Sequence, residues 1–487
     1  MILFKNDVKF IILTCLLISM GIAENVGQIS SSTQDHSPFD ISVGENILIS
    51  TSDEIFPHHV EPTLALSDNG DIAVGWKNAY TADGGGASVS YSFSSDGTTW
   101  SSPGYPTSFW PEGSSQSDPW MHYYGGTLYF LYIEFNIFDS QCTMSYTSDN
   151  GLTWDYSRAT FGTGFADKET FTIDENGNIF LVYDDVNQYS VDLKLSRSFD
   201  GGVTFVENVT ISDYPDFGYL GGYITTGSLG HVFTTFTYLG DSPDSSDIFF
   251  DQSLDFGETW SNDIDLNPDY NASTFTSNPN TGRPEKVSLS VVRERNDVLY
   301  VAWSDVFEDS VNKNWDVYLK SSDDFGGTWS NNIRINELID SNQWMPDFDF
   351  DSLGNLHFIY YDSSAQSGIL LKYRIYDPVR NIFSEEVTIP TVATSRSNTR
   401  PGDYVTIRID SNDIAHVVWT DGRNENLDIY YSQVVSTDFV PSGDSSQSNT
   451  NLGDNSSESS SFLNLNLVIL PILISLVFVK KRQKNFP

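Results

Sequence analysis

The amino-acid sequence predicts an all-β fold built from one repeated unit. Three observations support this prediction. A short turn motif recurs along the chain, aromatic residues make up 14% of its 487 residues, and short apolar runs alternate with clusters of Gly, Asn, Asp and Ser. Apolar runs bounded by turn residues are typical of β-strands. Repetition at a regular spacing indicates a repeat architecture, so the repeats are considered first.

The recurring motif has the pattern Ser/Thr-x-Asp-x-Gly-x-Thr-Trp/Phe. Four full copies and one copy shortened by a residue occur at 147–154, 198–205, 253–260, 322–329 and 94–100. The Asp carboxylate can accept backbone N–H bonds across a tight turn, and Gly supplies the positive φ that the turn needs. The closing Trp or Phe is expected to anchor the next strand. The turn-forming carboxylates are assigned to Asp96, Asp149, Asp200, Asp255 and Asp323.

This motif resembles the Asp box, or bacterial neuraminidase (BNR) repeat, of the sialidase-like β-propellers. The resemblance covers most of residues 46–436. In that family the box forms the turn between the third and fourth strands of a blade, on the face away from the active site. The resemblance therefore implies a propeller fold and gives the boxes a structural role, because a shared fold does not by itself show a shared function.

Seven segments open with similar dipeptides, about 50 to 60 residues apart, slightly longer than ordinary four-stranded blade repeats. These dipeptides are Glu61-Pro62, Asp118-Pro119, Lys168-Glu169, Leu220-Gly221, Arg283-Pro284, Met345-Pro346 and Arg400-Pro401. The last segment ends after a third strand at 428–435, and residues 46–51 resemble an unpaired fourth strand. We predict that these two strands pair and close a seven-bladed β-propeller, which removes exposed sheet edges. The alternative is six blades, as in the sialidases, plus one hairpin.

Both ends of the chain carry apolar segments. The first begins with Lys5 and Lys9 before an apolar run and is typical of a signal peptide. The second is followed at once by basic residues, as in a stop-transfer helix. The predicted organisation is a signal peptide (1–23), a flexible segment (24–45), the propeller (46–440), a Ser/Asn-rich stalk (441–461), a transmembrane helix (462–479) and a basic cytoplasmic tail (480–487).

This organisation predicts an exported, cell-surface protein whose extracellular propeller is anchored in the membrane by one helix. The alternative for the second apolar segment is a frayed tail, or a signal that is removed on wall attachment. Cys142 is the one cysteine outside the predicted signal peptide, so no intrachain disulfide is expected.

The chain is strongly acidic, with 66 Asp and Glu against 25 Lys and Arg and a formal net charge of −41. Nucleic acid is excluded as a partner, since phosphate binding needs a basic face. Self-repulsion at this charge favours a monomer, and the charge attracts divalent cations. Calcium is the one cofactor considered, with Asp305, Asp309 and Asp316 as candidate ligands, although the segment 305–316 lacks the Gly and the terminal Glu of an EF-hand loop.

Loops that enter first strands should share one face of the ring with loops that follow second strands. This face is predicted to carry the binding site, as a rim of carboxylates with a few arginines and two tryptophans. The candidate binding residues are Asp118, Trp120, Asp167, Lys168, Arg283, Trp344, Arg400, Asp421 and Arg423.

The resemblance implies that a sialidase site would need three Arg to hold the substrate carboxylate, a Tyr nucleophile activated by a Glu, and an acid/base Asp. Arg283, Arg400 and Arg423 match this number, and Tyr404 with Glu61 or Glu285 are the candidates for nucleophile and base. The Phe-Arg-Ile-Pro motif that precedes the first Asp box in bacterial sialidases is absent. The structural interpretation of each Arg is a salt bridge to a neighbouring Asp.

Two functions therefore remain. The first is a binding module that presents its acidic face to glycans, divalent ions or surface proteins. The second is a glycoside hydrolase resembling exo-α-sialidase. We favour the binding module because the predicted blade count, the missing motif and the scarcity of Arg all depart from the sialidases.

Overall fold

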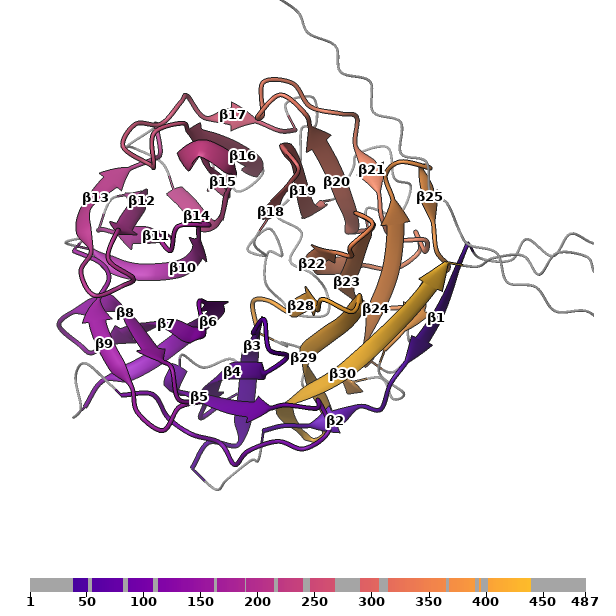
Figure 1. The fold of residues 1–487 in the computed structure, drawn as a ribbon, viewed down its shortest axis with the longest axis horizontal. Coiled ribbons are helices and arrows are strands. Elements are labelled where there is room, and N and C mark those ends of the chain that lie inside the picture. The colour runs from indigo at the N-terminus through magenta and orange to yellow at the C-terminus, as the bar shows by residue number, and fades with distance from the viewer. Residues whose placement is uncertain are drawn as a thin grey trace, which may run out of the picture. The chain divides into compact units, whose positions relative to one another are not determined.

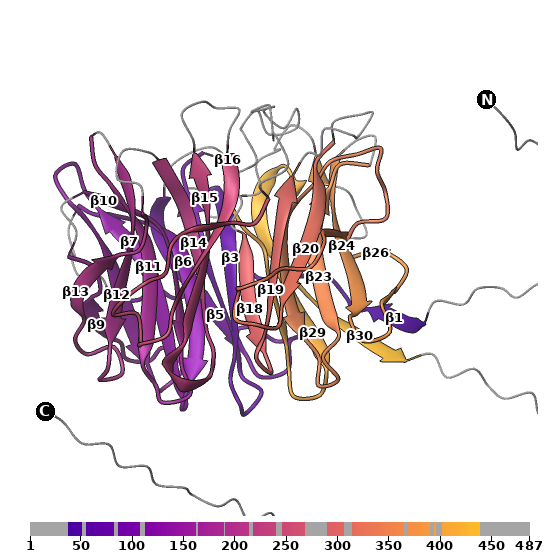
Figure 2. The same ribbon diagram turned by 90° about the horizontal axis from the view of Figure 1, so that it is seen from above.

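The computed structural model describes residues 38–50, 55–81, 86–107, 113–161, 164–188, 190–213, 218–239, 246–267, 290–305, 314–364, 368–389, 394–395 and 402–438. The chain divides into two compact units, 1–439 and 440–487, and every described residue belongs to the first. In this unit, antiparallel sheets stand around a central axis (Figure 1). Seen from the side, the strands run roughly parallel to that axis (Figure 2).

The sheets follow one another in chain order. The first contains β3 (His58–Leu66), β4 (Ile72–Ala79) and β5 (Gly86–Ser94). The second contains β6 (Ser115–Tyr124), β7 (Thr127–Phe135), β8 (Ser140–Thr147) and β9 (Asp155–Arg158). The third contains β10 (Phe165–Ile173), β11 (Ile179–Val186), β12 (Val191–Ser198) and β13 (Val206–Thr210), joined by one parallel pair to β14 (Gly218–Thr226), β15 (Val232–Leu239), β16 (Ser246–Ser253) and β17 (Ile264–Asp265). A 3-10 turn, η1 (Ser228–Gly230), connects β14 and β15.

The remaining sheets complete the circuit. One contains β18 (Val291–Arg295), β19 (Val298–Asp305), β20 (Asp316–Ser322) and β21 (Ile333–Arg334). The next contains β22 (Gln343–Phe350), β23 (Leu356–Asp362), β24 (Gly368–Asp377), β25 (Ile382–Phe383), β26 (Val387–Thr388) and β27 (Thr394–Ser395). The last contains β28 (Thr406–Ile409), β29 (Ile414–Asn424), β30 (Asn426–Asp438), β1 (Phe39–Val43) and β2 (Ile47–Leu48). The first strands β3, β6, β10, β14, β18, β22 and β28 lie nearest the axis (Figure 1).

The last sheet is completed by the N-terminal strands. Ile47 and Leu48 of β2 pair antiparallel with Tyr431 and Tyr430 of β30, and the Ile49 amide donates to the Ile429 carbonyl at 2.9 Å. This confirms the predicted pairing of residues 46–51 with 428–435. Because β1 and β2 cover the outer edge of β30, that edge of the sheet is not left open.

The apolar core lies between neighbouring sheets. All eight residues of β4 and all seven of β23 are buried, because each sheet is packed on both faces. Burial on both faces explains why the second strands are continuous apolar runs in the sequence. One cluster joins the first sheet to the last, with Trp76 and Val74 against Tyr431 and Val418. The ring is thus held closed by packing as well as by strand pairing.

The predicted turn chemistry is present in the recurring motif. In the copy that begins at Thr147, the Asp149 carboxylate accepts from the Thr153 amide at 2.9 Å, from the Thr153 hydroxyl at 2.7 Å and from the Thr147 hydroxyl at 2.8 Å. Gly151 has φ +79°. A threonine amide likewise donates to the carboxylates of Asp96, Asp200 and Asp255, and at Asp200 and Asp255 the threonine hydroxyl donates as well.

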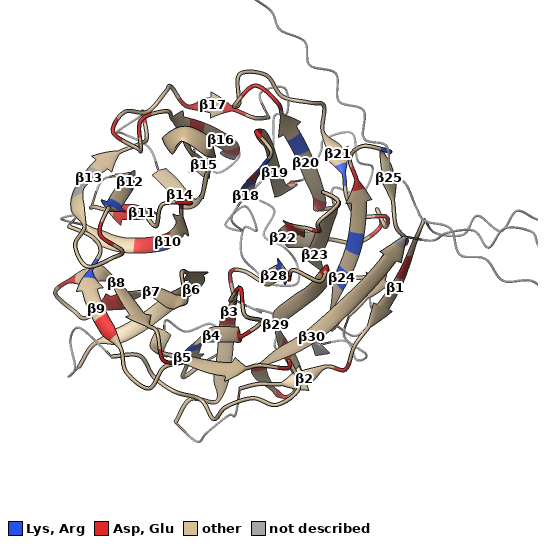
Figure 3. Cartoon of the chain, viewed as in Figure 1, with Lys and Arg blue, Asp and Glu red and all other residues tan. Residues whose placement is uncertain are grey.

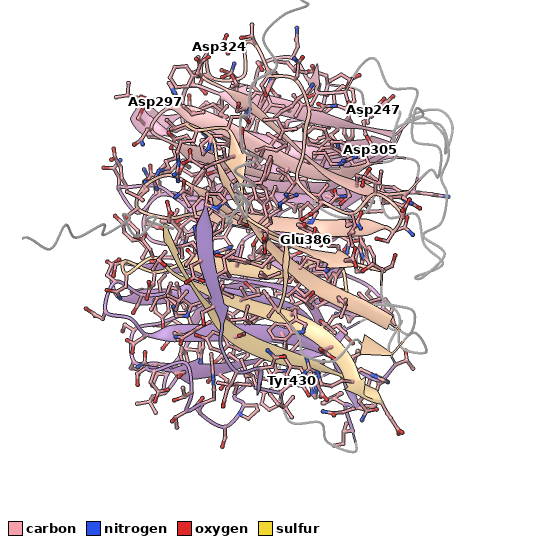
Figure 4. All side chains as sticks on the ribbon, turned by 90° about the vertical axis from the view of Figure 1, so that its right-hand side faces the viewer. Asp247, Asp297, Asp305, Asp324, Glu386 and Tyr430 are labelled. Carbon is pink, nitrogen blue, oxygen red and sulfur yellow. The ribbon has the colours of Figure 1, made fainter. Side chains whose placement is uncertain are left out.

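The fifth copy requires a correction. The turn-forming carboxylate is Asp324 and not Asp323, because Asp324 accepts from the amide and the hydroxyl of Thr328 at 2.7 and 2.8 Å. Two consecutive Asp residues occur here, and the pattern places the third position of the motif at Asp324. Figure 4 labels this residue in the turn after β20.

The closing aromatic residue of the motif packs on the preceding sheet rather than only anchoring its own strand. Trp154 packs at a tilt against Tyr91 with ring centroids 5.1 Å apart and donates to its hydroxyl at 3.1 Å. Trp329 meets the Phe250 ring edge-on at 5.0 Å. A Cβ at Gly326 would come within 2.2 Å of that Phe250 ring, so Gly is needed there for close approach as well as for its positive φ. The motif therefore joins adjacent sheets.

The predicted localisation is corrected. Within the ranges given above, no helix is long and apolar enough to cross a membrane. Residues 462–479, on which the anchor was predicted, lie outside the described residues, as do the predicted signal peptide 1–23, the stalk 441–461 and the tail 480–487. The single-pass anchor at the cell surface is therefore withdrawn.

Candidate functional site

Three of the innermost strands share an irregularity near their beginnings. The strand register shifts by a bulge between Val60 and Thr63 in β3, between Ser117 and Trp120 in β6, and between Asp167 and Thr170 in β10. The first residue of each bulge is Glu61, Asp118 or Lys168, with φ between +52° and +56°. A left-handed conformation costs a non-glycine residue on the order of 1 kcal/mol and is often retained at functional sites. These bulges direct three charged side chains from adjacent sheets toward one another.

Lys168 is the centre of this charged cluster. Its ammonium lies 3.0 Å from Asp118 Oδ2 and 2.5 Å from Asp403 Oδ2, where Asp403 precedes β28 of the last sheet. Burial alone would lower the pKa of Lys168, but the carboxylates of Asp118 and Asp403 hold it well above its ordinary value. Burial would likewise raise the pKa of Asp118, but Lys168 and Lys77 lower it to about 2. Both groups are therefore charged at neutral pH.

Glu61 extends the cluster into the first sheet. Its Oε1 lies 2.5 Å from the ammonium of Lys77, which is also 3.8 Å from Asp118 Oδ1. Glu61 is almost completely buried, with 1% of its surface exposed. Burial raises the pKa of Glu61 to about 8, against the opposing charge of Lys77. Two carboxyl groups that share one lysine thus have pKa values pushed apart, with Glu61 protonated and Asp118 ionised at neutral pH.

Two more carboxyl groups are buried beside this cluster. Glu169 follows Lys168 in the β10 bulge, and neither of its carboxyl oxygens has a hydrogen-bond partner among the described residues. Asp184 of β11 accepts from the Gly221 amide at 3.0 Å. Burial raises the pKa of both groups well above their ordinary values, and the neighbouring charges of Asp118 and Asp167 raise the pKa of Glu169 further. Both shifts favour the protonated form of these groups.

A pocket next to Asp403 is lined mainly by aromatic and apolar side chains. Its lining residues are Trp120, Tyr223, Val291, Met345, Pro346, Asp347, Asp403, Tyr404 and Val405. Trp120 stacks on Tyr404 with centroids 4.6 Å apart and meets Tyr223 edge-on at 5.7 Å. The Tyr404 hydroxyl donates to the Pro119 carbonyl at 3.0 Å. The pocket thus has aromatic walls with a carboxylate at its edge.

A second group of charges lies against this pocket. Asp347 binds Arg293 at 2.9 Å and Arg408 at 3.1 Å, and it also accepts from the Ile407 amide at 3.0 Å. Burial lowers the pKa of the neighbouring His122 to about 4, and the charges of Arg408 and Arg293 contribute to this shift. Both arginines are therefore engaged by a carboxylate of the protein itself.

Several predicted site residues have structural roles. Arg423 binds Asp421 at 2.5 Å and lies over the Tyr430 ring at 4.3 Å, so both Arg423 and Asp421 take part in a salt bridge within the last sheet. Trp344 is completely buried in the core against Tyr361. These contacts give all three residues structural partners, and Arg423 is bound to a neighbouring Asp as the structural interpretation expects; their binding roles stay predictions.

The predicted calcium ligands are also engaged by the protein. Asp305 accepts from the Asn267 side chain at 2.8 Å, and Asp316 accepts from the Asn336 side chain at 2.6 Å. In the described part of the chain, no group of three or more acidic, His or Cys side chains is arranged to hold a metal ion. Figure 4 shows Asp305 at one end of its strand and Asp297 at the other. Asp309, Arg283, Glu285 and Arg400 lie outside the described residues.

The structure therefore brings together Glu61, Asp118, Lys168, Trp120 and Tyr404 from the predicted set, with Asp167 adjacent to Lys168 in β10. Sequence analysis missed Lys77 and Tyr223, which enter the site from β4 and β14. Their sequences resemble those of ordinary core strands, and their role depends on contacts between sheets. Figure 3 shows the few basic residues distributed among many acidic ones around the ring.

Comparisons with known proteins show the fold. No protein-family model matches the sequence, and no curated protein matches it. An ulvan lyase solved with a bound GlcA(1-4)Rha3S unit has a TM-score of 0.52 and 11% identity, over 80% of this chain and 95% of that chain. A second ulvan lyase structure has a TM-score of 0.50 and 12% identity, over 81% and 94%. A microbial sialidase has a TM-score of 0.45 and 14% identity, over 68% of both chains. At these identities the likeness shows the fold alone, and that fold is the predicted β-propeller.

Proposed function

We propose that this protein is a seven-bladed β-propeller that binds carbohydrate at its axis. The observation that carries the proposal is the pocket in which the stacked pair Trp120 and Tyr404 lies beside the carboxylate of Asp403. A sugar ring has apolar C–H faces and a polar edge of hydroxyl groups. Aromatic walls with a few precisely placed polar groups are the usual composition of a small-ligand pocket.

The distribution of charge around the axis supports the same proposal. The charged side chains come from two places. Asp403 belongs to the last sheet, and the bulges of β3, β6 and β10 supply Glu61, Asp118 and Lys168. On the other side of the pocket, β22 contributes Met345 and Pro346. Asp347 of β22 also lines the pocket, so a ligand there would meet carboxylates on both sides, with apolar and aromatic walls between them.

The order of the strands supports the proposed blade count. The eight-stranded sheet consists of β10–β13 and β14–β17, linked by the single pair Val191 and Gly218. Counting these as two blades gives seven, each with its own first strand at the axis. The recurring turns at the outer strands are then Asp boxes of the propeller, as the sequence resemblance implies.

Glycoside hydrolysis is the second candidate. It is favoured by Glu61 and Asp118, whose different protonation states suit a general acid and an ionised partner. The exo-α-sialidase form of this candidate has less support, because Arg423 is bound by Asp421. Hydrolysis also requires access to Glu61, whose side chain is buried. Binding without catalysis is therefore the function that the geometry supports best.

The proposal is tested by calorimetric titration of the full chain with a panel of neutral, cationic and anionic oligosaccharides. Trp120→Phe shortens the aromatic wall and is expected to weaken binding about tenfold, or about 1.4 kcal/mol. Trp100→Phe is the matched control, because Trp100 lies in an Asp-box turn and meets Tyr431 edge-on, as Trp120 meets Tyr223. Equal affinities in the two variants, or no binding of any glycan by the wild type, would refute the proposal. Release of reducing ends during the titration would favour the hydrolase.

A further inference from the structure

Large apolar side chains are exposed at the end of the ring opposite the charged cluster. The cluster lies near the beginnings of the first strands, whereas these side chains lie in turns that follow the ends of first and third strands. Between 38% and 82% of the surface of each is exposed. We call them the turn patch, which consists of Phe199 after β12, Leu229 in η1, and Leu254 and Phe256 after β16.

The turn patch is continuous across two neighbouring turns. The Arg197 guanidinium lies over the Phe199 ring at 5.7 Å and donates to the Phe256 carbonyl at 2.9 Å. The Phe256 amide donates to the Gly230 carbonyl at 2.9 Å, and a Cβ at Gly230 would come within 2.5 Å of the Phe256 ring. Leu229 directly precedes Gly230. The exposed apolar groups therefore form one surface, and a contiguous apolar surface needs an explanation that single exposed side chains do not.

The recurring turn does not require apolar residues at these places. Phe199 and Leu254 occupy the second position of the motif, where the other copies have Ser95, Ser148 and Asp323. The hydrogen bonds between the Asp carboxylate and the threonine form in those copies as well. The apolar side chains at the second position therefore serve something other than the turn itself.

Leu229 is held in a strained conformation. Its φ is +60°, in the left-handed region that apolar residues rarely adopt. The corresponding position is Asn69, Asn176 or Asn412 in other turns, which are closed by the same backbone hydrogen bond. A left-handed Leu costs roughly 1 kcal/mol, and Asn tolerates this conformation much better. An exposed Leu is therefore kept here at a cost to folding, which is typical of a functional position.

The same turns carry carboxylates beside the apolar groups. Asp200 and Asp255 belong to the turns of Phe199 and Leu254, and Glu258 follows in the second of these turns. Burial would raise the pKa of Asp200 and Asp255, but hydrogen bonds from the threonine of each turn lower it below the ordinary value, so both are ionised at neutral pH. Every turn at this end of the ring lies within the described ranges. The turn patch is thus an apolar surface with an acidic border.

From this surface, and independently of the glycan site, we propose that the ring docks a partner protein at the turn patch. The partner presents apolar side chains that cover the patch, next to lysine or arginine residues that pair with Asp200, Asp255 and Glu258. Apolar patches with polar borders are typical of protein interfaces. The acidic border and the formal net charge of −41 disfavour a second copy of this chain and an anionic lipid surface.

The test measures binding of the full chain to a fluorescent peptide of leucine and lysine arranged with helical periodicity, by anisotropy. The peptide is expected to bind less tightly as ionic strength rises, and a peptide with glutamate in place of lysine is expected not to bind. A double variant, Leu229→Asn with Leu254→Ser, should weaken binding about tenfold or more, since two apolar anchors are lost. Leu353→Asn is the matched control, because Leu353 occupies the position of Leu229 in the turn after β22 and is 72% exposed.

Thermal stability gives an independent readout. The double variant introduces residues that other turns of this chain carry at the same positions. Its melting temperature should therefore be equal to or above that of the wild type, because Asn relieves the strain at Leu229. A lower melting temperature would show that these side chains stabilise the fold, and would overturn the docking role.

The remaining outcomes are also decisive. No binding of the leucine and lysine peptide, or equal affinity of the wild type and the double variant, would overturn the proposal. Equal binding of a peptide of lysine alone would show attraction by charge only, which overturns it as well. If the double variant instead abolishes a dimer seen by sedimentation, or adsorption to phosphatidylcholine vesicles, the patch belongs to a second copy or to a lipid surface and not to a basic partner. None of these results bears on the glycan site at the other end of the ring.

Discussion

Replacing Glu61 by Gln should change how the stability of the fold depends on pH. Burial raises the pKa of this carboxyl group from its ordinary value of 4.5 to about 8 in the folded protein. Between these values the folded state holds a proton that the unfolded state has lost, so stability falls as pH rises. Each pKa unit corresponds to about 1.4 kcal/mol, so ionising Glu61 between pH 5 and pH 8 costs roughly 3 kcal/mol of folding free energy. Gln mimics the protonated carboxyl group and does not ionise.

The assay is urea unfolding of the wild type and of Glu61→Gln at pH 5 and pH 8. From pH 5 to pH 8, the unfolding free energy of the variant should rise by roughly 3 kcal/mol relative to that of the wild type, whatever the stability of the variant at pH 5. Glu175→Gln, in the exposed turn between β10 and β11, controls for the loss of one carboxyl group at the surface. If the unfolding free energies of the wild type and of Glu61→Gln differ by the same amount at both pH values, the argument that burial keeps this group protonated is refuted.

Three further predictions concern the fold. Deleting residues 46–50 removes β2 from the edge of β30, so the thermal unfolding transition should become broader and move to a lower temperature. An unchanged transition in scanning calorimetry would count against closure of the ring by this strand. Asp324→Asn should lower the melting temperature and Asp323→Asn should leave it nearly unchanged, since only Asp324 binds Thr328; equal shifts would contradict this assignment. Cys142 is completely buried, and burial raises the pKa of its thiol well above the ordinary value. It should therefore react with iodoacetamide only in denaturant, and rapid labelling of the native protein would contradict this prediction.

Much of the fold could be predicted because its signals are local. The turn at Asp149 is determined by residues within the motif, because its partners are Thr147 and Thr153. The pairing of residues 46–51 with β30 was also predictable, since the last repeated segment lacked a fourth strand and residues 46–51 resembled a fourth strand without a sheet. The error at Asp323 arose because two adjacent Asp residues fit the motif, and only the hydrogen bonds to Thr328 distinguish them.

The site was less predictable because it depends on contacts between sheets. The recurring dipeptides drew attention to Glu61, Asp118 and Lys168, but their convergence follows from the bulges that turn the three side chains toward one another. Lys77 lies within the mainly apolar strand β4 and gave no signal of its own. Arg423 lies two residues after Asp421, the carboxylate that binds it. The pattern of the sequence alone did not distinguish this salt bridge from a ligand-binding role.

The central claim is that a sugar binds at the axis of the ring. A crystal structure of the full chain with a bound oligosaccharide tests it most directly. The account predicts a sugar ring against Trp120 and Tyr404 with a polar group on Asp403. A second hollow at the outer loops is lined by Phe138, which is 90% exposed, and by Phe165. A sugar in that hollow, with the axis unoccupied, would contradict the account.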